Sequence, residues 1–541
     1  MDMALPLSTA DHRVQDATAS PPGQSAPAAV AAGFPAATEA GIEVLREGGN
    51  AMDAAVAAAW ALGVCEPSAS GLGGHTVMLV RFANGRTVAI DGSSRAPAAA
   101  SIATITASDQ QRGYRSCTVP STPATLDWAQ RRYGALSRER VMAPAIRIAH
   151  EGYEVTPLQH RQTRWVEESL RATLGGHLFL HNGRAPRPGE RRRQPQLAAT
   201  LERLASLGAT DFYDGAIARQ IAHDMRRNGG LLNEGDLARC APPEEMEPLS
   251  TVHGDHLLLS APPPSSGLDL LLAFNVMNEL RAGGLEVCSD QWREAVALTT
   301  SAVFHERERR ALGATDLDQH VRQQVLGAPY ARDIARNLHN PAAWGVERPE
   351  EPGDTTHVSV CDAAGNVVLL TQSIHSVFGA RVAHPDLGFV YNNYLAMCPR
   401  TRHPYLLRPH CRPRSNIAPL LVLRADAADA KPLMALGAAG SRRIVSATLQ
   451  VVGAALALGR GIAEAVAAPR VHGLMGREVW IERSAASDAL LARLHARGRE
   501  PMVKPDFDYS MGAVQALQFN ENGRVSAAAD PRRDGAVRVT A

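Results

Sequence analysis

The sequence has almost no lysine. Among its 541 residues, only Lys431 and Lys504 are lysines, and neither lies in a recognisable motif. A catalytic lysine that forms a Schiff base is therefore a poor candidate for the chemistry. Arginine carries most of the positive charge, and Lys+Arg 56 against Asp+Glu 55 leaves a net charge of +1. Without a strong field of either sign, we expect no nucleic acid and no anionic membrane surface among the partners.

Cysteines and long apolar runs are also scarce. The seven cysteines are scattered and form no CxxC pair, which is unlike a disulfide framework or a zinc site, so we expect a reducing compartment, no metal and no cofactor. The longest apolar runs, residues 51–64 and 447–459, are too short to cross a bilayer. Residues 1–33 lack the apolar segment of a secretory signal and have the composition of a disordered lead. The sequence thus predicts a cytoplasmic protein without a membrane anchor.

Two common catalytic motifs are missing. The chain contains neither GxxxxGK[ST] nor GxSxG, so a P-loop and a serine-hydrolase nucleophile elbow are excluded. The glycine-rich segment 71–74 precedes a predicted strand, whereas a dinucleotide-binding loop follows one. The reactive group must therefore come from another part of the chain.

The hydrophobic pattern changes near residue 354. Helical periodicity dominates residues 36–64 and 125–235, with a hairpin pattern over residues 76–90 between them. Residues 340–354 hold three prolines, two glycines and four acidic residues, a composition typical of a linker. Beyond it, residues 356–373 have strand periodicity. These alternating patterns predict an α+β protein in which helices pack on sheets.

A threonine stands where this linker meets the first strand, in the segment Asp354-Thr355-Thr356-His357. If the chain broke before Thr355, one residue would combine a hydroxyl nucleophile with an α-amino base of pKa about 7.7–8.0. The break could be self-made, because the Thr355 hydroxyl could attack the Asp354 carbonyl to give an ester that water then hydrolyses. Taken alone, a threonine pair at this point is more typical of an ordinary strand, in which the hydroxyls have structural hydrogen bonds, than of a catalytic residue.

Together, several segments resemble the γ-glutamyltransferase family of N-terminal-nucleophile hydrolases and occur in the family's order. The resemblance implies a four-layer αββα sandwich and self-cleavage between Asp354 and Thr355. It also implies a large subunit, residues 34–354 behind the lead, and a small subunit, residues 355–541. Thr355 would attack an amide bond, and several such heterodimers could assemble into an oligomer. The segments are residues 47–80, 119–157, 262–267, 355–379, 413–419 and 437–450.

The resemblance also assigns roles around the nucleophile. Ser373 stands where the family has a second hydroxyl that hydrogen-bonds the nucleophile. Gly440 and Ser441 stand where two glycines form a backbone oxyanion hole. From local sequence alone, Gly440-Ser441 is equally typical of the start of the helix expected from Ile444, which would expose the same N–H donors.

The substrate-binding positions depart from the family pattern. Because no carboxylate remains at the positions that hold the substrate ammonium in transferases, that ammonium would be left unpaired at a cost of several kcal/mol. Arg95 is the preferred anchor for a substrate carboxylate, although it lies two residues after the position that matches the family's arginine. The changed positions are His375, Tyr394, Met397, Ser415 and Asn416.

We therefore expect a hydrolase of a small, carboxylate-bearing amide, with oxamate slightly favoured. Hydrolysis or transfer of γ-glutamyl groups from glutathione-like amides is a close alternative, and removal of a β-lactam side chain is a third. An unprocessed relative that only binds a metabolite is the alternative from another class. The complete set of Thr355, Ser373 and Gly440 argues against that last interpretation.

Overall fold

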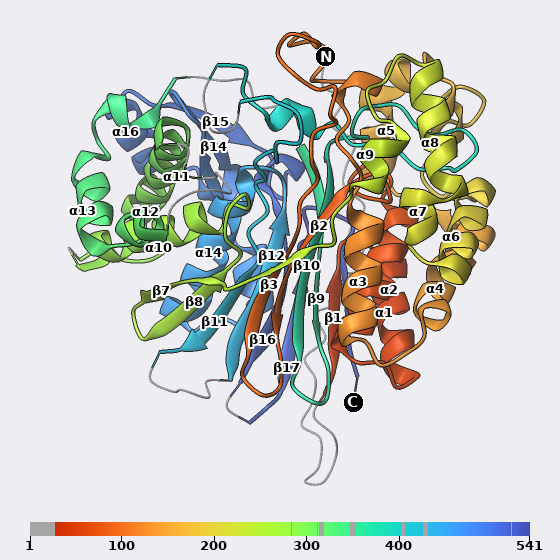
Figure 1. The fold of residues 1–541 in the computed structure, drawn as a ribbon. Helices are drawn as coiled ribbons and strands as arrows, with labels where there is room; N and C mark the ends of the chain where they lie inside the picture. Colours follow the sequence, from red (N-terminus) through yellow and green to blue (C-terminus); the bar gives the residue numbers. More distant parts are fainter. Residues whose placement is uncertain are drawn as a thin grey trace.

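The computed structural model describes residues 27–282, 284–310, 312, 319–346, 353–401, 406–425, 431–520 and 522–540 of the continuous chain. Two antiparallel sheets lie face to face, and a layer of helices covers the outer face of each (Figure 1). None of the helices in these ranges is long and apolar enough to cross a membrane.

The larger sheet carries the predicted nucleophile. In spatial order its strands are β18 (Ala536–Val539), β1 (Ala29–Ala32), β9 (Gly353–Cys361), β10 (Val367–Ser376), β2 (His75–Arg81), β3 (Thr87–Gly92) and β6 (Glu244–Met246). The smaller sheet comprises β17 (Val525–Ala529), β16 (Ala513–Phe519), β12 (Pro432–Ala439), β11 (Leu420–Arg424), β8 (His256–Ser260) and β7 (Leu249–His253). Two small sheets lie outside this sandwich: β13 (Val471–Gly473), β14 (Glu478–Glu482) and β15 (Glu500–Lys504), and the pair β4 (Tyr153–Glu154) and β5 (Arg191–Arg192).

The helices divide between the two outer layers (Figure 1). The layer of the larger sheet contains α1 (Pro35–Arg46), α2 (Ala51–Cys65), α3 (Thr122–Tyr133), α4 (Arg138–Glu151), α5 (Pro157–Arg171), α6 (Pro195–Leu207), α7 (Thr210–Asp214), α8 (Ala216–Arg227) and α9 (Glu234–Ala238). The other contains α10 (Gly267–Ala282), α11 (Asp290–Arg310), α12 (Gln319–Val325), α13 (Ala328–Asn337), α14 (Arg443–Leu458), α15 (Ile462–Ala467) and α16 (Asp488–Ala496). Short 3₁₀ turns are η1 (Tyr114–Ser116), η2 (Gly175–Phe179), η3 (Pro341–Trp344), η4 (Tyr394–Met397), η5 (Arg483–Ala485) and η6 (Tyr509–Met511).

Side-chain alternation along the strands separates the cores of the sandwich. On β2, Val77 and Leu79 lie in the core between the sheets, whereas Met78 and Val80 pack against the helical layer. Because both faces of β2 are buried, its four central residues are all hydrophobic. Helix α2 is buried all round, as its alanine-rich sequence allows, and Asn50 caps it by accepting hydrogen bonds from the Met52 and Asp53 N–H groups.

The predicted boundaries need one correction. Residues 29–32, placed in the disordered lead, form β1, which pairs with β9 on one side and β18 on the other. The sequence Ala-Val-Ala-Ala offers small apolar side chains to both faces, so the strand is buried without a strong periodic signal. The rest of the predicted lead, residues 1–26, and residues 347–352 of the predicted linker lie outside the described residues.

Gly437 on β12 packs directly against His357 of the other sheet. A Cβ atom at this position would lie 2.3 Å from Cε1 of His357 on β9, so we expect Gly437→Ala to destabilise the fold by about 1–3 kcal/mol through overpacking. Chemical unfolding followed by circular dichroism measures this. Gly461→Ala is the matched control, because nothing lies within 4 Å of its new methyl group. Equal stability of the two variants would contradict the sheet packing described above.

Candidate active site

Thr355 lies at the end of the sandwich, between the two sheets. It is the third residue of β9 and shares a face with His357, whose ring packs against Gly437 of the opposite sheet. Thr355 is only 6% exposed. Strand alternation therefore directs its side chain into the space between the sheets, while Asp354 and Thr356 face the helical layer.

The register of β10 places Ser373 against Thr355. Thr356 pairs with Gln372, so the next residues along the two strands, Thr355 and Ser373, lie opposite each other, with 3.2 Å between their Oγ atoms. A β-bulge follows, because Asp354 pairs with His375 instead of Ile374. His375 has a φ of 81°. Such bulges re-aim groups beside active sites, and here the His375 N–H points to the Ser373 hydroxyl.

The two hydroxyls form a short hydrogen-bonded chain that ends on the Asp354 carbonyl. Thr355 Oγ donates to Ser373 Oγ over 3.2 Å, and Ser373 Oγ donates to the Asp354 carbonyl oxygen over 2.8 Å. The His375 N–H donates to Ser373 Oγ over 2.9 Å and fixes its orientation. Thr355 Oγ also lies 2.7 Å from the Asp354 carbonyl oxygen. Attack of Thr355 on this carbonyl would thus place the developing negative charge beside the Ser373 donor.

Buried polar groups hold the Asp354 side chain. Its Oδ1 accepts hydrogen bonds from Arg533 and from the Thr355 N–H, the latter over 3.0 Å, and its Oδ2 accepts one from Gln162 Nε2 over 2.8 Å. The Arg533 guanidinium stacks 4.4 Å from the centre of the Tyr509 ring. Gln162, Tyr509 and Arg533 were not identified from the sequence, because none of them lies in a segment with a catalytic motif.

Gly440 and Ser441 connect β12 to α14 beside the start of β9. Gly440 has a φ of 120° and lies so close to Gly512 that a Cβ atom would be 2.9 Å from the Gly512 Cα. Ser441 adopts a left-handed φ of 58°, and a Cβ atom at Gly353 would lie 2.7 Å from the Ser441 Cβ. The predicted oxyanion-hole residues therefore lie next to the strand of the nucleophile and at a helix start, where N–H groups are free to bind an anion.

Aromatic rings form one wall of the site. Tyr394 stacks on His75 with a centroid distance of 3.9 Å and contacts His375 at 5.3 Å. Burial raises the pKa of Tyr394, an effect that hydrogen bonding to Ser373 and Ser415 partly offsets. His75 was missed in the sequence, although it directly follows the glycine-rich segment and pairs with Ser373.

Ser415 and Asn416 also belong to this region. Ser415 Oγ lies 3.5 Å from His75 Nε2, and Asn416 donates to Ser441 Oγ over 2.9 Å. The buried Arg307 supports both residues by donating to the Ser415 carbonyl and the Asn416 side chain. The structure thus brings together four of the five predicted substrate-binding residues, namely His375, Tyr394, Ser415 and Asn416.

Arg95 lies elsewhere. Its guanidinium is 3.7 Å from the Glu244 carboxylate, with 38% of the side chain exposed, and it lines a small surface hollow with His410 and Arg412. Within the described ranges, its contacts connect it to Glu244 rather than to Thr355 or Tyr394. The charge of Arg414, by contrast, acts on a residue of the site, because it contributes to the lowered pKa of His375.

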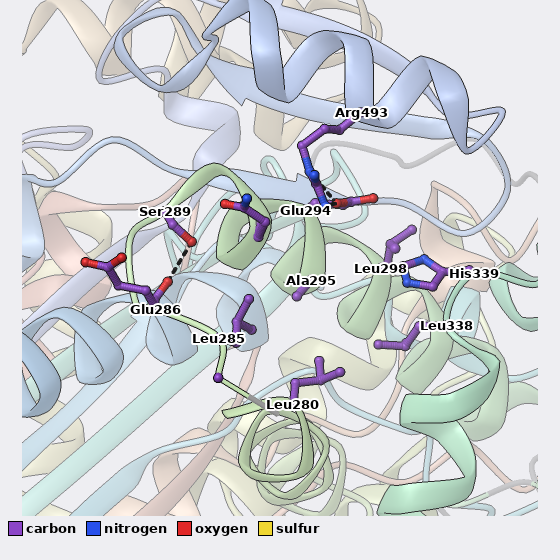
Figure 2. A pocket seen from close by; sticks show the side chains of 12 residues that line it. Leu280, Leu285, Glu286, Ser289, Glu294, Ala295, Leu298, Leu338, His339 and Arg493 are labelled. Atoms are coloured by element: carbon purple, nitrogen blue, oxygen red, sulfur yellow. Dashed lines mark hydrogen bonds and ion pairs between the residues drawn. The ribbon is translucent and has the colours of Figure 1, made fainter. Parts of the chain in front are cut away.

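A separate cavity of about 420 Å³ lies in the other helical layer (Figure 2). Leu280, Leu285 and Leu298 form its apolar floor. Glu294 at its edge is paired with Arg493 of α16 (Figure 2). The cavity contains none of the residues around Thr355, so we do not assign the chemistry to it.

The buried histidines predict how stability depends on pH. Burial lowers the pKa of His357 and of His75 to about 3, and burial together with Arg414 lowers that of His375 to about 4. Unfolded histidines titrate near pH 6.5, so the unfolded state binds more protons between pH 6.5 and 4 and the fold loses stability as the pH falls through this window. We expect His357→Gln, which can still bond Thr371 and Ser359, to reduce this slope by up to about 1.4 kcal/mol per pH unit.

Urea unfolding at several pH values between 6.5 and 4.5 measures the slope. The exposed His150, replaced by glutamine, provides the control and should leave it nearly unchanged. An unaltered slope for His357→Gln would show that His357 is protonated in the folded protein.

Comparisons with known proteins cover most of the chain. A model of the family described as gamma-glutamyltranspeptidase matches residues 37–540. The glutathione hydrolase proenzyme of Escherichia coli (strain K12) is 30% identical over 528 residues, which cover 92% of this chain and 89% of that protein. The oxamate amidohydrolase proenzyme of Klebsiella pneumoniae subsp. pneumoniae is 31% identical over 525 residues, which cover 92% and 96%.

The structural comparison leads to the same group. The crystal structure of cephalosporin acylase from Bacillus halodurans superposes with a TM-score of 0.85 and 26% sequence identity, over 99% of this chain and 98% of that one. This agreement confirms the four-layer αββα fold expected from the sequence. The chain therefore belongs to the γ-glutamyltranspeptidase family of enzymes that act on amide bonds.

Proposed function

We propose that the protein is a precursor that cleaves itself between Asp354 and Thr355 and then hydrolyses a small, carboxylate-bearing amide, with oxamate as the simplest candidate. The observation that carries the proposal is the position of Thr355 Oγ, 2.7 Å from the Asp354 carbonyl oxygen and hydrogen-bonded to Ser373. A threonine that only stabilised a strand would not require this arrangement.

The self-cleavage is an N-to-O acyl shift followed by hydrolysis. Thr355 Oγ attacks the Asp354 carbonyl carbon, the C–N bond breaks, and the proton lost from the hydroxyl is taken up by the new amino group. Water then cleaves the resulting ester, which leaves a carboxylate on Asp354 and restores the Thr355 hydroxyl. Ser373 donates to the carbonyl oxygen throughout, at the point where negative charge develops.

The mature site repeats this chemistry on an external amide. The Thr355 hydroxyl attacks the substrate carbonyl, its own α-amino group accepts the proton and passes it to the leaving amine, and water releases the acyl group. The backbone N–H groups of Gly440 and Ser441 stabilise the oxyanion, each by about 3–4 kcal/mol.

The surroundings favour a substrate without an ammonium group. His75 and His375 are neutral above about pH 4, since burial lowers the pKa of each, and with Tyr394 they form a neutral wall. Arg414, which is ion-paired with Glu308, contributes to the lowered pKa of His375. A carboxylate is more compatible with these surroundings than the ammonium of a γ-glutamyl group, and the relationship to an oxamate amidohydrolase supports this choice.

A β-lactam side-chain acylase is the second candidate. The support for this candidate is the cephalosporin acylase structure, which superposes over nearly the full chain. A γ-glutamyl hydrolase or transferase ranks third, because Tyr394 and Met397 occupy the positions of its ammonium-binding groups.

Self-cleavage is tested by Thr355→Ala. We expect this variant to remain one chain with no amidase activity, while the wild type separates into two fragments on a denaturing gel, with Thr355 at the new N-terminus by mass spectrometry. Thr356→Ala is the matched control, since it removes the adjacent buried hydroxyl, and it should still be cleaved. An intact wild-type chain after long incubation would favour the metabolite-binding alternative.

Substrate choice is tested with the mature enzyme. We expect kcat/KM for ammonia release from oxamate to exceed that for aniline release from γ-glutamyl-p-nitroanilide by about tenfold or more, because an unpaired buried ammonium costs several kcal/mol. The third substrate in this comparison is a cephalosporin whose side chain is a dicarboxylic acid attached through an amide bond. Faster cleavage of the anilide would refute the argument from the missing ammonium partner.

A further inference from the structure

Asp354 is bound in this structure as a carboxylate ligand would be. Its side chain is fully buried, and both carboxylate oxygens have donors: Arg533 and the Thr355 N–H at Oδ1, and Gln162 at Oδ2. Its main-chain carbonyl meanwhile lies against the Thr355 and Ser373 hydroxyls. One residue therefore occupies both the reactive position and an anion-binding position.

Arg533 has more binding capacity than Asp354 uses. Its side chain is 6% exposed, and within the described part of the chain its Nε and Nη2 atoms are buried without a hydrogen-bond partner. Only Nη1 is engaged, by Asp354 and by the Thr355 carbonyl oxygen at 3.1 Å. Unsatisfied buried donors are costly. Glu66 contributes an opposing charge nearby, but it makes no hydrogen bond to Arg533 among those found in the described ranges.

On the basis of the proposed self-cleavage, we propose that Arg533 and Gln162 form a carboxylate subsite, which Asp354 fills in the precursor and the substrate fills in the mature enzyme. The same Thr355 hydroxyl attacks in self-cleavage and in substrate hydrolysis, so the acyl group of the Asp354–Thr355 peptide bond indicates which acyl group the substrate has. That acyl group belongs to Asp354, and its carboxylate binds beside the nucleophile.

Cleavage favours the exchange of Asp354 for substrate. The product end carries two carboxylates, the side chain and the new α-carboxylate. Burial already raises the pKa of the neighbouring Glu66 to about 8, so this region accommodates additional negative charge poorly. Like charges crowded in a buried site repel one another. Once Asp354 leaves, a buried guanidinium without a counter-ion is strongly unfavourable, and a substrate carboxylate satisfies it.

The covalent structure of Asp354 defines the substrate class. Two carbons, Cα and Cβ, separate its carbonyl from its carboxylate. The subsite therefore fits monoamides of dicarboxylic acids with a two-carbon spacer, such as succinamate. Oxamate has its carboxylate attached directly to the amide carbonyl, so it would reach Arg533 less well than succinamate does.

Succinate binding to uncleaved variants tests the subsite without any turnover. By calorimetry, we expect Thr355→Ala to bind succinate at least about tenfold more weakly than Thr355→Ala/Asp354→Ala, in which the carboxylate of Asp354 no longer fills the site. Adding Arg533→Gln to the double variant should remove this gain. Adding Arg538→Gln instead should preserve it, because Arg538 is an exposed partner of Glu39 in the same C-terminal segment.

Equal binding by the single and double variants, or no effect of Arg533→Gln, would overturn the subsite. Melting temperatures of all four proteins establish that each is folded. Because these variants are catalytically silent, the result does not depend on which amide the mature enzyme cleaves.

Kinetics of the cleaved enzyme provide the second measurement. For succinamate, Arg533→Gln should raise KM by about tenfold or more, and Arg533→Lys should recover part of the loss because it retains the charge. For butyramide, which has a methyl group in place of the carboxylate, KM should change less than twofold. An equal effect on both amides would assign Arg533 a purely structural role. Hydrolysis of neither succinamate nor oxamate, together with the expected succinate binding, would refute the proposed function and leave the subsite in place.

Discussion

The register of the β9–β10 ladder is the constraint on which the geometry of the site depends. Thr371 pairs with His357 and Gln372 with Thr356, and the continuation of this register sets Ser373 opposite Thr355, on the face between the sheets. The bulge follows directly: its additional residue, Ile374, leaves His375 to pair with Asp354, and the His375 N–H then holds the Ser373 hydroxyl in place. A slip of the ladder by one residue would reverse every side chain of β10 and turn Ser373 away from the Asp354 carbonyl.

Local backbone strain surrounds this bulge. His375 and Ser441 have positive φ values, although neither is a glycine, and such conformations cost on the order of 1 kcal/mol or more each. Both residues lie next to the nucleophile's surroundings: His375 hydrogen-bonds to Ser373, and Ser441 packs against Gly353 of β9. The buried cores on both sides of the larger sheet hold these conformations in place. The rigidity of the sandwich is thus what keeps the hydroxyls within hydrogen-bonding distance of the carbonyl.

Sequence patterns were sufficient for the residues that act locally and insufficient for those that meet through tertiary structure. Thr355 and Ser373 lie in adjacent strands joined by a tight turn; strand periodicity predicted the two strands, and the family resemblance pointed to the two hydroxyls, which lie 3.2 Å apart. Gln162 comes from α5 and Arg533 from the C-terminal segment, so only the folded chain brings them to Asp354. Arg95 shows the opposite case. It was expected to bind the substrate carboxylate because it lies two residues from a motif position, but its side chain pairs with Glu244. Side-chain direction at such a point depends on register, which composition does not determine.

The buried ion pairs near Thr355 bear on how one site could serve an internal and an external amide. Asp354 pairs with Arg533, and Arg307 pairs with Asp269. Buried pairs of this kind contribute little net stability, but removal of one partner is severely destabilising. In the proposed self-cleavage, the release of Asp354 would remove the carboxylate that is bound to Arg533 and leave a buried cation beside the new nucleophile. The energetic cost of that cation would draw an anionic substrate to Thr355, so that the proposed maturation would create the binding affinity and the catalytic group in the same step.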